Sequence, residues 1–296
     1  MKIATDTNCF YQVYTDFETI DILAEAGFDA IDYTFMDERY YSGEFSESER
    51  RAYFETLKEY AHGKGICFNQ AHAPCPSSTA NEEDTEKRFH NIVRSMQNAA
   101  WLGAGQIIVH PINHIEYHNP ADVEKAFELN MVFYNRLKPY CEEYQIRVAL
   151  ENLTDFRNTI MGHRFFPTTC SSPEEFIRYM DALDSEWFIA CLDIGHATVV
   201  HQSPADFIRK LGQNRLKALH VHESDGNRDS HTLPFLCGVP DWAEITAALH
   251  EIGYRGDLNF EAGNFLKPLP KELYPAGARM LTETGRYLVK MINREM

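Results

Sequence analysis

The sequence predicts an α/β protein with the (β/α)8 TIM-barrel architecture, and three observations lead to that prediction. Eight short β-type runs alternate with longer helical stretches from one end of the chain to the other. Some runs are almost entirely apolar, for example 107–109 and 148–150, as expected of parallel strands buried on both faces. Neither a G-x-G-x-x-G fingerprint nor a P-loop is present, so an open doubly wound sheet is the less favoured alternative fold.

The elements follow one another in a regular order. The expected strands are Lys2–Ala4, Ala30–Tyr33, Ile66–Gln70, Gln106–His110, Arg147–Glu151, Phe188–Asp193, Leu216–His222 and Asp257–Glu261. The helical period appears in Phe17–Ala26, Glu47–Lys64, Asp84–Leu102, Pro120–Tyr144, Ser172–Leu183, Pro204–Leu211, Trp242–Ile252 and Ala276–Arg294. We expect irregular loops elsewhere, the longest including Thr154–Ser172.

Composition narrows the class of protein. The 296 residues fit a single barrel domain, residues 1–296, because no linker or repeat divides them. The net charge of −16 argues against nucleic acid as a partner, since phosphate backbones attract basic faces. We expect no signal peptide and no membrane span, and seven widely spaced cysteines without a C-x-x-C fit the cytoplasm.

Six consecutive predicted strands, the third to the eighth, end in a histidine or a carboxylate. The carboxyl ends of barrel strands meet in one ring, where active sites are built. Buried carboxylates need a cation among them, and carboxylate and imidazole ligands suit Mn, Co, Zn, Fe or Mg. Taken singly, each group is more simply a hydrogen-bonded core residue. Their joint placement predicts a divalent-metal site made of Glu151, Asp193, one histidine of the seventh strand and Glu261.

At these residues the chain resembles the xylose isomerase-like superfamily of sugar and sugar-phosphate isomerases and epimerases, which also holds endonuclease IV. The likeness covers most of the chain and is specific in Leu150-Glu151-Asn152, Leu192-Asp193-Ile194-Gly195-His196, His220-Val221-His222 and Phe260-Glu261. Resemblance to the ketose 3-epimerases implies one metal held by Glu151, Asp193, His222 and Glu261. His222 is favoured because the family has an arginine six residues after its ligand histidine, where this chain has Arg228.

The same resemblance makes His196 and Arg228 substrate-binding residues, and we assign His72 and His110 to substrate binding as well. Two departures affect the substrate pocket. The epimerases have a second glutamate shortly after the fifth strand, where this chain has Arg157 or Asn158. The loop before Asp241-Trp242 lacks the P-G-x-G of many relatives.

Endonuclease IV is the rival resemblance, because it holds three zinc ions with nine ligands. Candidates for all nine exist in this chain: His72, His110, Glu151, Asp193, His196, His220, Asp229, His231 and Glu261. His220, Asp229 and His231 are therefore candidates for an additional metal. A D-x-H pair such as Asp229 and His231 also recurs in sugar-type members, so it does not by itself imply three metals.

We therefore expect a metal-dependent sugar or sugar-phosphate isomerase or epimerase with Mn, Zn, Co or Mg as cofactor and a small sugar as substrate. Glu151 and Glu261 are the expected catalytic pair, transferring a proton through a metal-stabilised enediolate. No lysine follows Glu151, which disfavours a hydride shift. The alternatives are a keto-polyol dehydratase, an abasic-site endonuclease and a non-catalytic sugar-binding protein. Barrels of this kind are often dimers or tetramers, so a homo-oligomer fits this class.

Overall fold

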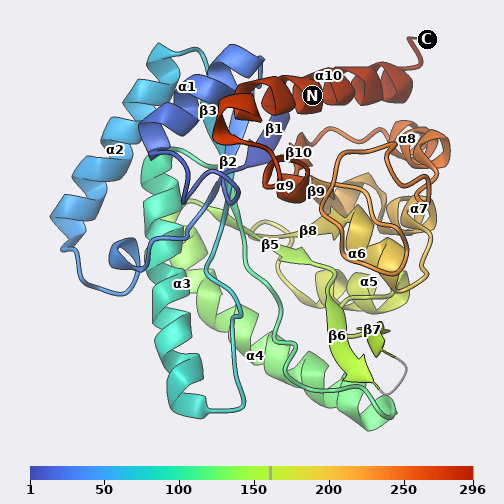
Figure 1. Ribbon diagram of the computed structural model, residues 1–296. Coiled ribbons are helices and arrows are strands. Elements are labelled where there is room, and N and C mark those ends of the chain that lie inside the picture. Colours follow the sequence, from blue (N-terminus) through green and yellow to red (C-terminus); the bar gives the residue numbers. More distant parts are fainter. Residues whose placement is uncertain (160–161, 296) are drawn as a thin grey trace.

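The computed structural model describes residues 1–159 and 162–295, and its eight parallel strands form a closed barrel (Figure 1). Their order around the barrel is β1-β10-β9-β8-β5-β4-β3-β2, closed by parallel pairing of β1 with β10. The barrel strands are β1 Ile3–Asp6, β2 Ala30–Thr34, β3 Cys67–His72, β4 Gln106–Ile108, β5 Arg147–Glu151, β8 Phe188–Asp193, β9 Leu216–Val221 and β10 Leu258–Phe260. The predicted barrel class is thereby confirmed.

Helices surround the barrel, and side-chain caps fix where most of the long ones begin (Figure 1). Thr15 with Glu18 and Ser46 with Glu49 form capping boxes at α1 and α2. The helices are α1 Asp16–Ala26, α2 Glu47–Gly63, α3 Glu82–Leu102, α4 Pro120–Tyr144, α5 Pro173–Ala182, α6 Ile194–Val199, α7 Pro204–Arg215, α8 Trp242–Glu251, α9 Gly263–Leu266 and α10 Tyr274–Asn293. Short 3-10 turns span Glu38–Tyr40 and Lys271–Leu273. No helix in the described ranges combines the length and apolar character needed to cross a membrane.

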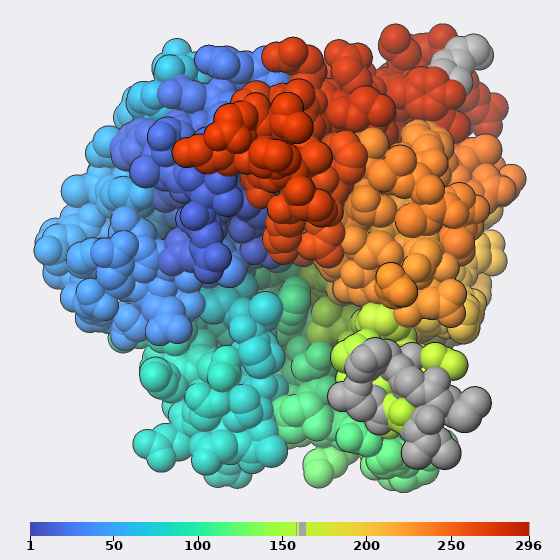
Figure 2. Space-filling view, in the orientation of Figure 1, coloured from blue at the N-terminus to red at the C-terminus, as the bar shows by residue number. Residues whose placement is uncertain are grey.

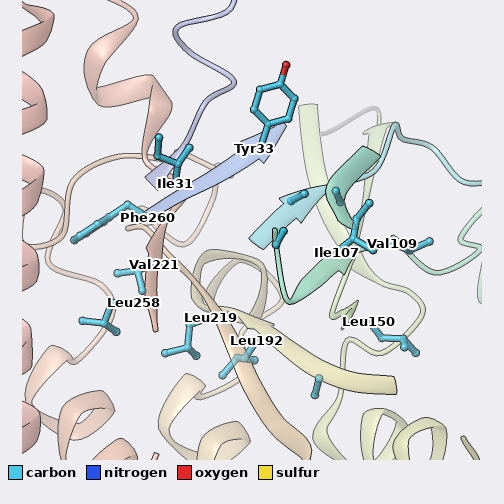
Figure 3. Close-up of a cluster of buried hydrophobic side chains, with 14 of the residues drawn as sticks. Ile31, Tyr33, Ile107, Val109, Leu150, Leu192, Leu219, Val221, Leu258 and Phe260 are labelled. Atoms are coloured by element: carbon cyan, nitrogen blue, oxygen red, sulfur yellow. The ribbon is translucent and has the colours of Figure 1, made fainter. Parts of the chain in front are cut away.

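The two faces of each barrel strand differ in character, because successive side chains point to opposite sides. The outward side chains are large and apolar and pack under the helices; Figure 3 labels Leu150, Leu192, Val221 and Phe260 among them. The inward side chains form a separate, smaller apolar cluster of Ile108, Ala149, Ile189, Cys191 and Ala218. Because side chains alternate along each parallel strand, the last polar side chain of a strand faces the barrel axis.

Two register shifts decide which residues of β3 and β9 face inward. Ile31 pairs with Phe68 but Asp32 pairs with Gln70, so Asn69 is an extra residue in β3. Ala190 pairs with Leu216 but Cys191 pairs with Ala218, so Lys217 is an extra residue in β9. Each extra residue reverses the alternation that follows it, and the later histidines of both strands turn toward the axis.

The structure corrects several expected boundaries. The segment Thr154–Ser172, expected to be irregular, contains an antiparallel hairpin of β6 Thr154–Thr159 and β7 Gly162–Pro167. Phe156 and Phe165 face each other across it with ring centroids 5.2 Å apart, a cross-strand pair that stabilises the hairpin. Figure 2 shows lime-coloured atoms of this hairpin at the surface, below the segments coloured orange. β1 continues to Asp6 instead of ending at Ala4, and β4 ends at Ile108 before His110.

Candidate metal centre and active site

Every barrel strand contributes a histidine or carboxylate to the inner face, at or just beyond its carboxyl end. The sequence predicted this for the third to eighth strands; the structure adds Asp6 on β1 and Asp32 on β2, both buried. Asp6 was missed because its strand was expected to stop at Ala4, and Asp32 because it lies inside its strand. The alternation Ala4-x-Asp6 and Ala30-x-Asp32 was the available signal for both.

At the centre, ligand atoms of four residues lie within 4.8 Å of one another: Glu151, Asp193, His220 and Glu261. The Nδ1 atom of His220 lies 3.4 Å from Glu151 Oε2 and 3.0 Å from Glu261 Oε2. The same nitrogen lies 3.6 Å from Asp193 Oδ2. The structure thus brings together the three carboxylates predicted as metal ligands, and the Nδ1 atom of His220 lies within 3.6 Å of an oxygen of each.

His222, the ligand histidine that the family resemblance favours, lies beside this group. Its Nε2 is 2.9 Å from Asp193 Oδ2, and its ring stacks on His231 with centroids 4.1 Å apart. With His231 and Glu261 it forms another set of ligand atoms within 4.8 Å. A Cβ added to Gly195 would lie 1.9 Å from the His222 ring, so this glycine of the Asp193-x-Gly195 motif leaves the space that the ring occupies.

Asn152, the residue after β5, connects the end of this strand to the end of β8 through two hydrogen bonds with Asp193. Its amide donates to the Asp193 carbonyl at 3.0 Å, and the Asp193 N–H donates to Asn152 Oδ1 at 2.7 Å. The Asp193 carboxylate also accepts from the His196 N–H at 2.6 Å and caps α6. Two backbone-anchored contacts therefore fix Asp193 relative to Glu151.

The predicted additional ligands converge on the outer side of the same mouth. Asp229 Oδ2 lies 3.3 Å from His196 Nε2 and 2.8 Å from His231 Nε2, and the three residues offer ligand atoms within 4.8 Å of one another. His231 Nδ1 lies 2.9 Å from the carbonyl oxygen of Glu261. The loop after β9 is thereby tied to the end of β10.

Of the remaining predicted site residues, two lie at the barrel mouth and one lies away from it. His72 lies 3.0 Å from Asp32 and stacks on His220, and His110 lies 3.2 Å from Glu151, so both belong to the mouth. Arg228 does not join them: its side chain is 84% exposed, and its ion pair in the structure is with Asp225 at 4.0 Å. Sequence reasoning also missed Cys75, whose thiol pKa is lowered by the hydrogen bond to His110.

In this buried cluster the charges of the imidazoles offset the effect of burial on the pKa of the carboxylates. Burial alone would raise the pKa of Glu151, but the charges of His220 and His110 hold it well below its ordinary value. Burial likewise opposes the lowering of the pKa of Glu261 to about 2, which His220 and His231 cause. Asp6 differs: burial and the charges of Glu261 and Asp32 raise its pKa to about 7, because they outweigh the lowering caused by His72 and His231. The cluster is therefore acidic in residue type but depends on cationic partners to keep its carboxylates ionised.

The donors present fit a divalent cation. Glu151 Oε2 and His220 Nδ1 are buried and have no hydrogen-bond partner of good geometry among the described residues, which is unusual for buried polar atoms. Three carboxylates and one imidazole form a hard, oxygen-rich ligand set of the kind that Mn, Zn, Co and Mg accept. Such an ion could be held by Glu151, Asp193, His220 and Glu261. His222 is the alternative imidazole ligand.

Comparisons with known proteins agree with this fold. The sequence profile described as "Xylose isomerase-like TIM barrel" matches residues 20–284. A D-psicose 3-epimerase of Enterocloster bolteae is 27% identical over 208 residues, covering 68% of this chain and 63% of that protein. A mannonate dehydratase of Thermotoga maritima is 28% identical over 160 residues, 51% of this chain and 42% of that one. Thus this chain matches about two-fifths to two-thirds of the length of these curated relatives.

Among solved structures, a D-tagatose 3-epimerase-like protein superposes with a TM-score of 0.75. The match covers 100% of this chain and 99% of that one at 23% identity, and it shows the shared fold. The sequence relatives therefore include a sugar epimerase and a sugar-acid dehydratase.

Proposed function

This chain belongs to the xylose isomerase-like TIM barrel family, and from that premise we propose that it is a divalent-metal-dependent isomerase or epimerase of a sugar or sugar phosphate. The observation that supports the proposal most is the convergence of Glu151 and Glu261 on one point beside His220. Two carboxylates at one reacting carbon are what proton removal and proton return require. The relatedness to a D-psicose 3-epimerase agrees with it.

In this proposal Glu151, Asp193, Glu261 and a β9 histidine hold the ion. The geometry favours His220 for that histidine, and His222 is the alternative drawn from the family resemblance. When bound, the cation supplies Lewis-acid stabilisation of the negative charge that develops on the substrate oxygens.

The chain's own residues perform the proton transfers. One of Glu151 and Glu261 removes the proton from the carbon next to the substrate carbonyl, and the other returns a proton. Return to the opposite face of the same carbon gives epimerisation, and return to the neighbouring carbon gives isomerisation. His196 Nδ1, 3.1 Å from Glu151 Oε1, and His110 orient the Glu151 carboxylate. His72 and His110 remain our proposed substrate contacts, together with His196.

A dehydratase is the second candidate, favoured by the relatedness to mannonate dehydratases. It would use the same proton removal but expel a β-hydroxyl group. An abasic-site endonuclease is favoured only by the outer group of His196, Asp229 and His231, which offers a place for another metal. The net charge of −16 opposes binding to DNA.

Metal content and isotope exchange together test the proposal. We expect one equivalent of divalent metal per chain after loading with Mn²⁺, and solvent deuterium at a carbon next to the carbonyl of at least one ketose in D2O. Loss of water from a sugar acid without epimerisation would favour the dehydratase. Three equivalents of metal with nicking of abasic DNA and no sugar exchange would replace the proposal with the nuclease.

A further inference from the structure

A polar cavity of about 240 Å³ opens beside Glu261 and has no role in the chemistry described above. It is lined by Asp6, Asn8, His231, Glu261, Gly263, Asn264 and Lys267. Its volume is below the range of about 300–1,000 Å³ typical of sites for drug-sized ligands, so it suits part of a small molecule. Because Glu261 is one of its walls, whatever occupies it lies next to the proposed reaction centre.

Asp6 is the residue in this cavity with an unused polar atom. Thr5 pairs with Phe260 in the parallel β1–β10 ladder, so Asp6 and Glu261 follow as lateral neighbours on the inner face. Asp6 is 2% exposed; its Oδ2 accepts from the Asn8 N–H at 3.2 Å, whereas its Oδ1 has no hydrogen-bond partner among the described residues. A buried carboxylate oxygen without a partner in a cavity wall points to a ligand group.

The other polar residues of the cavity limit what that ligand group is. Both ring nitrogens of His231 are already engaged, by the Glu261 carbonyl and by Asp229. Lys267 and Asn264 are exposed, so the cationic side chain of Lys267 stands at the solvent side of the cavity. Deeper in, an occupant meets two neighbouring carboxyl groups, Asp6 and Glu261. A phosphate would face like charge there, whereas a sugar hydroxyl both donates and accepts and so matches a carboxyl group.

We propose that this cavity binds the hydroxylated arm of an unphosphorylated ketose, with Asp6 as the residue that selects it over a sugar phosphate. The proposal rests on the function proposed above and names its substrate class. Asp6 receives a hydroxyl of the arm on Oδ1, and Lys267 and Asn8 contact the more exposed hydroxyls. The reacting carbon is thereby held beside Glu261.

Matched pairs of substrates test this inference on the Mn²⁺-loaded full-length protein. Deuterium exchange is followed for D-fructose against D-fructose 6-phosphate and for D-ribulose against D-ribulose 5-phosphate. We expect kcat/KM for the free ketose to exceed that for its phosphate by about tenfold or more, since a charged-group hydrogen bond or its loss is of that size.

Variants of Asp6 assign the effect to this residue. Asp6→Ala is expected to raise KM for the free ketose about tenfold with kcat within about threefold, because the contact is made equally in ground and transition states. Asp6→Asn, which keeps the shape and hydrogen-bonding capacity, is expected to fall in between and serves if the alanine variant does not fold. Glu128→Gln on the exposed side of α4 is the matched control and should behave as wild type.

The outcomes separate this inference from the function on which it rests. A preference for the phosphorylated ketose that is lost in Lys267→Ala would overturn the inference and leave the proposed function intact. An unchanged KM in folded Asp6 variants would also overturn it. Absence of exchange with every sugar in the wild-type protein would contradict both.

Discussion

The outer and inner faces of the barrel strands are built from neighbouring residues yet serve different ends. Leu150, Leu192 and Phe260 point outward and are fully buried beneath the helices, while Glu151, Asp193 and Glu261 follow them in sequence and point inward. Among the described residues, the buried polar atoms of the inner face that have no hydrogen-bond partner include atoms of Asp6, His72, Glu151 and His220. The comparison teaches that the outer face supplies stability and the inner face holds groups left unsatisfied for a ligand.

Glu261→Gln gives the largest expected effect and addresses the inner face. The amide cannot accept the proton, so exchange into a ketose should fall by about 10²–10⁴-fold. Thermal unfolding should change little, because the amide has nearly the same shape as the carboxylate and Glu261 lies at the barrel mouth, where it interacts with His220 and His231. Deuterium incorporation and the melting temperature are the two measurements. Exchange at the wild-type rate would remove Glu261 from the reaction.

Phe260→Ala, one residue away, addresses the outer face. Phe260 is 0% exposed, and α10 approaches it closely at Gly285, where an added Cβ would lie 2.9 Å from the ring. Removing the ring should cost about 3–5 kcal/mol of the free energy of unfolding, through lost burial and a cavity. Denaturant unfolding measures this cost, while the folded fraction should bind Mn²⁺ with wild-type stoichiometry. A loss of metal binding without a loss of stability would mean that the two faces are not separable in this way.

Substitutions of His220, of His222 and of Gly195, which contacts the His222 ring, give the smallest expected effect and sharpen the assignment of the ligand. His220→Ala should weaken Mn²⁺ binding about tenfold more than His222→Ala, because it removes a proposed ligand, whereas His222→Ala removes a contact of a ligand, whose loss costs about 10–100-fold. Gly195→Ala displaces the His222 ring and should weaken Mn²⁺ binding no more than His222→Ala does. Calorimetric titration ranks the three. The opposite ranking would make His222 the ligand, as the family resemblance implies.

Much of the fold could be predicted because it depends on local patterns. Apolar strand runs separated by helical periods identified all eight barrel strands, and strand-end residues identified Glu151, Asp193 and Glu261. The β6–β7 hairpin was missed because its pairing depends on cross-strand contacts such as Phe156 with Phe165, not on a continuous apolar run. Asp6 was missed because the expected first strand ended at Ala4, two residues too early to include it.

By itself the sequence determined that acidic and imidazole groups would gather at the carboxyl ends of barrel strands, since chain order and a two-residue period suffice for that. Only the tertiary structure decided which of them meet. The extra residues Asn69 and Lys217 turn His72 and His220 toward the axis, and the loop after β9 brings in Asp229 and His231 while leaving Arg228 exposed. The physical reason is that register shifts and loop paths are set by pairing between strands distant in sequence, which no local pattern records.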